Sequence, residues 1–578
     1  MDDPINHPLI DWEFLNKCTI GFDKDHMPQG EDVKNNFKDY ILGTYDGKPK
    51  TAEWASEICG IEPSEIRHLA LELGKNNKVA FLCGMASART KNADNLPQLI
   101  MTIGAMTGHM GKSGHMTGST MHATSGNGGP ALVKAGSDGL PAIANPIDDT
   151  INANEVWNAI IDGKYNFTGS GSFVSPKQYA KGQIRDIDIR VIYSAAGANL
   201  QTSDGMSKGI EAHRKVDLVV AHGQFLTTNA KYADIVLPVI TEWEKFGGFL
   251  GGNLVHSGNR EMIINYSQIT QPLFEAKSDQ WIAIELGKRL GIDPKEIYPF
   301  DEKQQYFNTL STIEVVKDDG KAYEPLVTIT PEDIAELGVK GSPQTGRISY
   351  KEFKEKGVYQ VKRFQGDNYG YIAYENFRKD PTSNPLNTPS GKLEICSLTL
   401  ANKINQMGYS KISPIPTYIN VKDGYVDTFA DWDKKIKGEF KYQLISPHYL
   451  RRSHSVFDNV KWLQEAWRNP VFISPKDAKE NGISENDSVL ITSAYGKVLR
   501  NAVVTERLMP GVIALPHGAW VDIDEKTGID MGGADNILAG QYPTGQGVSG
   551  FNSVIVKIEK YHSKLIDDIN KPARVIFS

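Results

Sequence analysis

Apolar and polar positions near the start of the chain follow helical spacing, interrupted by one short apolar run. Residues 51–74 carry apolar side chains at helical spacing, and Gly60 followed by Pro63 divides them into two predicted helices. Residues 79–84 (VAFLCG) form an apolar run that ends in glycine, which predicts a short apolar strand. Residues 96–106 again have a helical pattern. The predicted order is therefore helix, helix, strand and helix.

Three apolar runs farther along the chain predict a parallel sheet. Residues 187–193, 216–223 and 233–239 are apolar, and a helical stretch lies between the first two. Apolar strands that alternate with helices are typical of a parallel sheet covered on both faces. We therefore predict a Rossmann-like α/β fold in which ligands bind at the carboxyl ends of the strands.

The C-terminal part of the chain has a different pattern. From Tyr442 the strands are short and separated by turns, and one short helix, PKDAKENGI, interrupts them and is capped by Gly482. This pattern predicts a closed, β-barrel-like domain. Residues 300–440 are richer in Pro, Gly and charge, and TPSGKLEIC at 388–396 is their clearest turn and strand.

Composition narrows the class of protein. The 578 residues are 40% hydrophobic, which suffices for large buried cores, and the length corresponds to about four domains. The formal net charge is −7 with mixed signs and no basic stripe, which argues against nucleic acid as a partner. The four cysteines lie far apart without a Cys-x-x-Cys pair. Neither a disulfide framework nor a cysteine-held metal cluster is therefore predicted.

The sequence as given has no signal for export or membrane insertion. The opening stretch MDDPINHPLIDWEF lacks a basic segment followed by an apolar core, and no run of about eighteen apolar residues occurs. We therefore expect a soluble, cytoplasmic chain.

A glycine-rich segment at residues 103–119 contains a Gly-Lys-Ser triplet. A phosphate-binding loop of the nucleotide-hydrolase kind needs a glycine five positions before the glycine of that triplet, and Met106 stands there instead. We therefore predict that this segment is a turn following the helix at residues 96–106. Gly108, Gly111 and Gly114 are predicted to be turn and packing residues, and Lys112 is predicted to be a solvated charge.

Three loops have compositions that favour a ligand: residues 194–204, 448–455 and 532–552. The second loop packs two arginines, two histidines and two serines into HYLRRSHS, and arginine forks and hydroxyls bind phosphate oxygens. Glycines in the third loop allow close approach to a ligand, although such turns are also ordinary on a barrel rim. The sequence has no nucleophile elbow, His-Glu-x-x-His helix or metal-spaced His/Cys cluster. If the protein is an enzyme, we expect a bound cofactor to carry the reactive centre.

Several stretches, taken in order, resemble the molybdopterin oxidoreductases of the dimethyl sulfoxide reductase family. The resemblance spans nearly the whole chain, and the opening EFLNKCTIGFD and the wording HSVFDN are most similar to anaerobic dimethyl sulfoxide reductase catalytic subunits. It implies an α/β fold with parallel-sheet, Rossmann-like dinucleotide-binding domains, followed by a C-terminal double-psi-type β-barrel. The stretches are MTGHMGKSGH, TTNAKYADIVLPVITEWEKFG, TPSGKLEI, SPHYLRRSHSVFDNVKWLQEAW and NPVFISPKDAKENGISENDSVLI.

The resemblance divides the chain into four predicted ranges. They are a partial α/β molybdopterin domain at 1–185, a Rossmann-like nucleotide-binding domain at 186–300, a connecting α/β region at 301–438 and a dinucleotide-binding β-barrel at 439–578.

Family members hold molybdenum between the dithiolenes of two pterin guanine dinucleotides. The resemblance implies the same cofactor here, molybdenum bis(molybdopterin guanine dinucleotide), bound by residues that match the family's motifs. On the α/β side these are Gly84, Arg89, Asn92, Gly197, Asn199, Thr228 and Asp234. In the barrel they are His448, Arg452, His454, Ser455, Asn536, Gln546 and Asn552.

The sequence departs from the family's pattern in two respects. Many relatives place an acidic residue that accepts hydrogen bonds from guanine where this chain has Gly223, and His222 and Gln224 are candidate replacements. Nothing matches the family's cysteine-rich iron–sulfur segment or its protein ligand to molybdenum, so we assign no catalytic residue and no metal ligand. We expect the chain to correspond to the C-terminal part of a catalytic subunit.

Two functions are compatible with this resemblance. In the first, the chain works with a separately encoded N-terminal piece that carries the iron–sulfur cluster, or belongs to a longer chain, and takes part in anaerobic S- or N-oxide reduction. In the second, it is a catalytically silent molybdopterin-binding module. For complete relatives the resemblance implies an iron–sulfur electron-transfer subunit, a membrane anchor subunit, export and membrane association through those partners.

Overall fold

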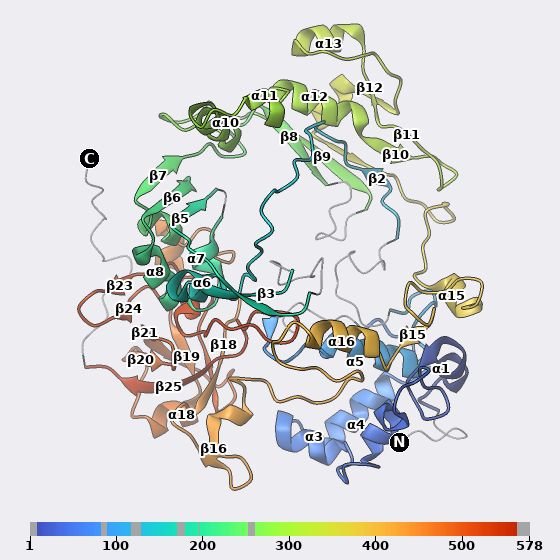
Figure 1. Cartoon of the computed structure of the whole chain (residues 1–578), viewed down its shortest axis with the longest axis vertical. Coiled ribbons are helices and arrows are strands. Elements are labelled where there is room, and N and C mark those ends of the chain that lie inside the picture. Colours follow the sequence, from blue (N-terminus) through green and yellow to red (C-terminus); the bar gives the residue numbers. More distant parts are fainter. Residues whose placement is uncertain are drawn as a thin grey trace.

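The fold is taken from a computed structural model. It describes residues 8–81, 89–116, 129–169, 180–195, 197–251 and 260–562. In Figure 1 the elements are arranged around a ring, with the barrel and a parallel sheet on the left, antiparallel sheets at the top and the N-terminal helices at the lower right. The mixed α/β architecture with a closed barrel confirms the predicted fold class. In the described part of the chain, no helix is long and apolar enough to cross a membrane.

The N-terminal part is helical. The two helices predicted within residues 51–74 are present, and Gly60 ends the first in a left-handed conformation (φ +72°) that glycine adopts without steric cost. The helix predicted at residues 96–106 has those bounds. The helices here are α1 (Trp12–Cys18), η1 (Val33–Asn35), α2 (Phe37–Leu42), α3 (Ala52–Cys59), α4 (Pro63–Glu72) and α5 (Leu96–Met106).

The strand predicted at residues 79–84 is not found as a full strand in the portion that the structure describes. Ala80 forms only an isolated parallel bridge with Met116, and residues 82–88 lie outside the described ranges. The bridge is held by hydrogen bonds from Phe81 N–H to the Met116 carbonyl and from Met116 N–H to the Val79 carbonyl, both 3.0 Å. The strand is therefore found only as this bridge, and it stays a prediction for residues 82–84.

The predicted parallel sheet is present as three strands in the order β5–β6–β7. Helix α8 connects the first two strands, as the sequence pattern indicated, and a short antiparallel pair, β3–β4, precedes the sheet. The elements are α6 (Val156–Asp162), β3 (Lys164–Phe167), β4 (Gln183–Asp186), β5 (Val191–Ser194), α7 (Asn199–Thr202), α8 (Met206–Lys215), β6 (Leu218–Gly223), α9 (Thr228–Lys231) and β7 (Ile235–Pro238).

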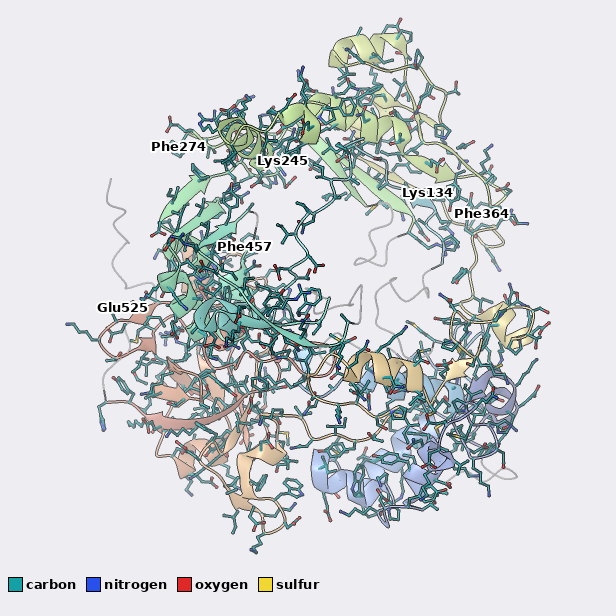
Figure 2. All side chains as sticks on the ribbon, in the orientation of Figure 1. Lys134, Lys245, Phe274, Phe364, Phe457 and Glu525 are labelled. Carbon is teal, nitrogen blue, oxygen red and sulfur yellow. The ribbon has the colours of Figure 1, made fainter. Side chains whose placement is uncertain are left out.

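Antiparallel sheets in the orders β14–β9–β8 and β11–β10–β2 lie at the top of Figure 1. Lys134 of β2, labelled in Figure 2, lies opposite Glu314 of β10, with Nζ 3.0 Å from the carboxylate. Sheets therefore join segments from ranges predicted as separate domains, and the boundaries themselves stay predictions. The strands are β2 (Val133–Lys134), β8 (Gly247–Gly251), β9 (Met262–Ser267), β10 (Glu314–Val316), β11 (Tyr323–Pro325) and β14 (Val358–Gln360).

The remaining elements between this part and the barrel are short. Strand β1 (Thr19–Ile20) pairs in parallel with β15 (Leu393–Glu394), the strand predicted in TPSGKLEIC. The other strands are β12 (Val327–Thr328), β13 (Ile348–Ser349), β16 (Phe429–Asp431) and β17 (Ile436–Lys437). The helices are α10 (Asp279–Arg289), α11 (Pro294–Ile297), α12 (Glu302–Thr312), α13 (Pro331–Leu337), α14 (Tyr350–Lys356), α15 (Glu375–Lys379), α16 (Leu398–Asn405) and η5 (Val426–Thr428).

The C-terminal part contains a closed barrel of six strands. Their order is β19–β22–β18–β25–β20–β21, and β21 pairs back to β19, so the ring has no free edge, while β24 and β23 extend the sheet from β21. The strands are β18 (Tyr442–Ile445), β19 (Val471–Ile473), β20 (Ser488–Thr492), β21 (Lys497–Val504), β22 (Val512–Ala514), β23 (Ile523–Asp524), β24 (Ile529–Asp530) and β25 (Ile555–Lys560).

The prediction of a single helix in this part was wrong. Helix α17 (Lys461–Ala466) precedes the predicted α18 (Pro475–Glu480), and a 3₁₀ turn, η6 (Asp535–Ile537), lies near the end. Helix α17 buries none of its side chains, so it lacks the apolar periodicity by which a helix is recognised in sequence.

A shared hydrophobic core joins the barrel to helices α6, α7 and α8. Trp157, Leu200 and Met206 belong to the same buried cluster as the barrel residues Val471 and Val489. This packing fixes the carboxyl end of β5 against the late loops of the barrel.

Two segments that follow neighbouring strands of the barrel touch each other. Strands β18 and β22 are parallel, so the residues after them emerge at the same edge. Gly518, after β22, has φ +87°, and a Cβ at this position would overlap the backbone carbonyl of His454. Glycine is required there both for its conformation and for the close approach of the two chains.

We expect Gly518→Ala to lower the free energy of unfolding by about 3 kcal/mol, because the added methyl group is both strained and overlapped. Gly511→Ala is the matched control, since Gly511 also has φ +87° but nothing lies within 4 Å of an added Cβ. That control should cost only about 1 kcal/mol. Urea unfolding midpoints measure both, and equal shifts would contradict the role of the contact.

Candidate functional site

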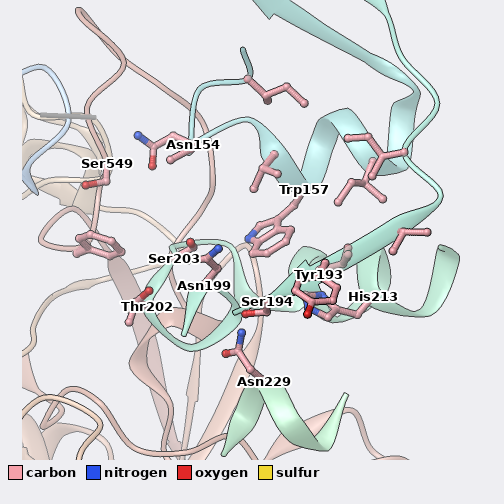
Figure 3. A pocket seen from close by; sticks show the side chains of 18 of the residues that line it. Asn154, Trp157, Tyr193, Ser194, Asn199, Thr202, Ser203, His213, Asn229 and Ser549 are labelled. Atoms are coloured by element: carbon pink, nitrogen blue, oxygen red, sulfur yellow. The ribbon is translucent and has the colours of Figure 1, made fainter. Parts of the chain in front are cut away.

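A cavity of about 450 Å³ lies at the carboxyl end of β5, in the size range of small-molecule sites. Strand β5 and helices α6 and α7 form most of its wall, and a late barrel loop and Arg89 complete it. Figure 3 shows side chains from these elements gathered around the space. Its polar side chains are Arg89, Asn154, Ser194, Asn199, Thr202, Ser203, His213, Asn229 and Ser549, and its aromatic ones are Trp157, Tyr193 and Phe551.

Two buried polar groups of this cavity have no protein partner among the described residues, Ser549 Oγ and Trp157 Nε1. The exposed Asn199 amide also lines the cavity. Buried polar groups nearly always have a partner, and unsatisfied ones call for a ligand or water. The amide, hydroxyl and aromatic groups together fit a nucleotide, which offers hydrogen-bonding edges and a flat base.

Other cavity residues already bond to the protein and shape the site. Asn154 Nδ2 donates to the Gly547 carbonyl (2.6 Å), and Gln201 N–H donates to Asn229 Oδ1 (3.3 Å). His213 Nδ1 lies 2.7 Å from the Gly209 carbonyl, and burial lowers the pKa of this histidine. A neutral His213 beside Trp157 keeps that wall of the cavity uncharged.

Two stretches predicted at the site from opposite ends of the chain lie side by side. Asn552 N–H donates to the Arg89 carbonyl (3.0 Å), and Asn92 N–H donates to Thr544 Oγ1 (3.0 Å). Gln546 N–H donates to a carboxylate oxygen of Asp94 (3.0 Å). The structure therefore brings Arg89, Asn92, Gln546 and Asn552 together, while Gly84 lies outside the described residues.

Thr228, Asp234 and Asn536 take part in contacts within the protein. Thr228 Oγ1 bonds to the Gln201 side chain and accepts from Val521 N–H (3.2 Å), while Asn536 Nδ2 donates to the Gln201 carbonyl (2.9 Å). Asp234 accepts from Val219 N–H (2.8 Å) between two strands of the parallel sheet. None of the three lines the cavity, and Gly197 lies in the turn just before Asn199. Their roles as ligands stay predictions.

His448, Arg452, His454 and Ser455 lie at the barrel edge and do not line the cavity. Arg452 is buried, and its guanidinium donates to Asp458, Asn469 and two backbone carbonyls. These bonds give Arg452 a structural role in holding the loop, beside its predicted role in cofactor binding. His448 and His454 are exposed at the tip of the loop.

The two candidate replacements for the missing acidic residue are engaged elsewhere. His222 has Nδ1 2.6 Å from Asp279 and Nε2 2.7 Å from the Tyr193 hydroxyl, so both ring nitrogens have partners. Gln224 Nε2 donates to the Ile240 carbonyl (3.1 Å).

The sequence did not point to the α6 wall of the cavity. Trp157 belongs to a short amphipathic helix whose pattern is that of any buried helix, and Asn154 precedes it without a motif. No local signal distinguishes Trp157 and Asn154, because their role depends on a distant barrel loop. The carbonyl of Gly547 in that loop accepts a hydrogen bond from Asn154, 393 residues earlier in the sequence.

The Gly-Lys-Ser segment is a packed turn, as predicted. Gly108, Gly111 and Gly114 all have positive φ, and a Cβ on each would overlap a side chain or backbone atom of a neighbouring segment. The prediction for Lys112 was wrong: its side chain is only 32% exposed and Nζ lies 3.8 Å from Asp11. Burial lowers the pKa of Lys112, because the turn folds it against the N-terminal helices rather than into solvent.

Two buried carboxyl groups tie the late barrel loop to the rest of the protein. Asp94 accepts from Gln546 N–H, and Asp204 accepts from Gly550 N–H (2.9 Å). Burial raises the pKa of both groups to about 6. Each of them also has a buried oxygen without a partner among the described residues.

Comparison with known proteins agrees with this architecture. Residues 47–289 match the family "Molybdopterin oxidoreductase", and residues 442–553 match the "Molydopterin dinucleotide binding domain". The chain belongs to the molybdopterin oxidoreductase family. Its cavity lies where the two matched regions meet, since its walls come from both.

Individual relatives of the chain are named as reductases of S- and N-oxides. Dimethyl sulfoxide reductase DmsA of Escherichia coli is 31% identical over 93% of this chain and 60% of its own length. Trimethylamine-N-oxide reductase of Haemophilus influenzae is 28% identical over 96% of this chain and 63% of its own. The chain thus spans about three fifths of the length of these relatives.

A solved structure supports the same fold. Acetylene hydratase from Pelobacter acetylenicus matches with a TM-score of 0.60 over 96% of this chain and 68% of its own, at 17% identity. At this identity the likeness shows the fold alone.

The raised pKa values of Asp94 and Asp204 predict a loss of stability as pH rises. Both carboxyls hold a proton in the folded state up to about pH 6, whereas the unfolded chain releases it near the ordinary value of 3.8. Their contribution is therefore present below about pH 4 and is lost as the pH rises to about 6, by up to about 3 kcal/mol for each group. Urea unfolding at a series of pH values measures this loss.

Asp94→Asn tests the assignment, because asparagine can still accept from Gln546 N–H but does not titrate. We expect its unfolding midpoint to fall less between pH 4 and 6 than that of the unaltered chain. The exposed Asp433→Asn is the control and should leave the slope unchanged. The assignment is wrong if Asp94→Asn keeps the full slope.

Proposed function

We propose that the chain forms the part of an S- or N-oxide reductase that holds the nucleotide ends of molybdenum bis(molybdopterin guanine dinucleotide). The observation that carries the proposal is the cavity between the carboxyl end of β5 and the barrel, which has an unsatisfied polar group on each side, Trp157 Nε1 and Ser549 Oγ. The relatives of the chain that are named as dimethyl sulfoxide and trimethylamine-N-oxide reductases support the substrate class. When bound, the cofactor supplies two-electron oxygen-atom transfer.

The residues of the cavity divide this task among them. The Asn199 amide offers both a donor and an acceptor, as the edge of a guanine base requires. Trp157 and Phe551 cover the site and exclude water from the base. Arg89 carries the positive charge that suits a diphosphate, and its guanidinium lies 5.6 Å from the Phe551 ring.

The proposal extends to partners by analogy with the family. We propose that electrons arrive through an iron–sulfur electron-transfer subunit with a membrane anchor subunit, and that the complete assembly is exported. The iron–sulfur cluster and the ligand to molybdenum would come from a segment outside this sequence, in a longer chain or a separate piece. Gene neighbours that encode such subunits would support this arrangement.

Asn199→Ala is expected to lower the nucleotide content of the protein about tenfold, because it removes an amide that lines the cavity and can hydrogen-bond to the base. The protein is purified from cells that make the cofactor, acid-released GMP is quantified, and molybdenum is measured on the same sample. Asn402→Ala, on the exposed face of α16, is the matched control and should retain full GMP content.

If the Asn199 variant has an unchanged GMP content and an unchanged melting temperature, the cavity does not bind the nucleotide end of the cofactor. Viologen-linked reduction of dimethyl sulfoxide and trimethylamine N-oxide then tests the reaction itself. GMP retention without turnover, even after a segment carrying the iron–sulfur cluster is supplied, would identify the chain as a binding module.

A further inference from the structure

Three polar side chains are joined by hydrogen bonds that end at the cavity beside β5. The Tyr193 hydroxyl lies 2.7 Å from His222 Nε2, and His222 Nδ1 lies 2.6 Å from a carboxylate oxygen of Asp279. The His222 side chain is only 2% exposed, whereas Tyr193, labelled in Figure 3, lines the cavity and is 46% exposed. This Asp279–His222–Tyr193 triad therefore runs through a buried imidazole to a hydroxyl that a ligand can reach.

The parallel sheet explains why the triad forms. Tyr193 of β5 is in register with Val220 of β6, and side chains two positions apart on a strand share a face, so His222 lies diagonally beside Tyr193. Helix α10 begins with Asp279, just after Lys277, whose N–H donates to the carbonyl of the last residue of β7 (3.3 Å). The start of α10 is thereby held next to the carboxyl ends of the strands.

The partner of Nδ1 fixes the direction of the hydrogen bond at the other end of the imidazole. A carboxylate only accepts, so the proton of the neutral His222 ring lies on Nδ1, facing Asp279. Nε2 then carries the lone pair and accepts from the Tyr193 hydroxyl. Partial burial and the Asp279 carboxylate raise the pKa of Tyr193, so the hydroxyl keeps its proton. With that proton committed to His222, the Tyr193 oxygen offers only lone pairs to a ligand.

An oxygen that only accepts hydrogen bonds distinguishes between nucleotide bases. Guanine has two adjacent donors, N1–H and the N2 amino group, and both can point at one acceptor. Adenine and cytosine instead have an acceptor nitrogen beside their amino group, and its lone pair would face the lone pairs of the tyrosine oxygen. Such a mismatch leaves polar groups unpaired inside a site, which is an effective way to reject the wrong ligand.

We propose that Tyr193, directed by His222 and Asp279, is the residue that selects guanine in this cavity. Gly223, the last residue of β6, has no side chain that could accept from the base. Asn199 lines the same cavity, and its amide can donate to O6 of guanine while Tyr193 accepts from N1 and N2. The inference rests on the proposed function and deepens it, because it assigns the choice of base to the site proposed to hold the dinucleotide.

Free nucleotides measure the choice of base without the rest of the cofactor. The full chain is purified from cells that cannot make the cofactor, and GMP, IMP and AMP are titrated into it by calorimetry. We expect GMP to bind at least about tenfold more tightly than AMP. IMP lacks only the N2 amino group of GMP, so its affinity should lie between the other two.

Tyr193→Phe removes the acceptor oxygen and keeps the ring. We expect this variant to bind GMP about tenfold more weakly and AMP almost as before, so that the preference for guanine disappears. Tyr45→Phe is the matched control, because the exposed Tyr45 hydroxyl also bonds to a partner, Asp39 (2.9 Å), but does not line the cavity. The control should keep the full preference for GMP.

Asp279→Asn tests the direction of the hydrogen bond rather than its presence. Asparagine can donate as well as accept, so it no longer fixes the proton on Nδ1, and the Tyr193 hydroxyl becomes free to donate to N1 of adenine. We expect AMP to bind more tightly and the preference for GMP over AMP to fall about fivefold. Asp23→Asn is the matched control, since Asp23 lies 2.8 Å from His26 Nδ1 away from the cavity.

The inference is overturned if the chain binds no GMP, if it prefers GMP no more than AMP, or if Tyr193→Phe keeps the preference. It is also overturned if Tyr193→Phe and Asp279→Asn weaken GMP and AMP equally, because a merely structural role would affect both nucleotides alike. The GMP content of chain purified from cells that make the cofactor separates the two proposals. Loaded chain without any GMP contradicts the proposed function, whereas loaded chain with GMP and an unchanged preference in Tyr193→Phe contradicts only this inference.

Discussion

The structure depends on the hydrophobic core that the parallel-sheet helices share with the barrel. Trp157 of α6, Leu200 of α7 and Met206 of α8 are all but inaccessible to solvent, and they lie in one cluster with the inner residues of the barrel. Because that interior is close-packed, the two parts cannot shift independently. The cavity at the carboxyl end of β5 lies at the rim of this core, and its shape is therefore set by packing rather than by the loops alone.

Much of the fold could be predicted from the sequence because its signals are local. Strands β5, β6 and β7 are short apolar runs bounded by polar or glycine residues, and the barrel strands alternate with turns. The pairing of β1 with β15 could not be predicted, because its two-residue strands lie more than 370 residues apart and carry no pattern. Helix α17 was missed because it is short and none of its residues is fully buried, so it lacks a clear apolar face.

Some residues of the candidate site could likewise be predicted from the sequence, and others could not. Asn199 and Arg89 were found because each lies in a stretch whose composition or motif has meaning by itself. Trp157, Asn154 and Ser549 acquire their role only from the segments that fold against them, and no single stretch of sequence contains that information. The same holds for the Tyr193 hydroxyl, whose direction is set by His222 and, through it, by Asp279, 57 residues after His222 in the sequence.

The pairing of residues 89–94 with residues 544–553 has a consequence for the order of events during synthesis. The Asn552–Arg89 and Gln546–Asp94 bonds join positions more than 450 residues apart, and Ser549 and Phe551 close the cavity from the late side. A ribosome must therefore finish nearly all of this sequence before the wall exists. The cavity proposed for the dinucleotide is therefore incomplete on a nascent chain that lacks residues 544–553.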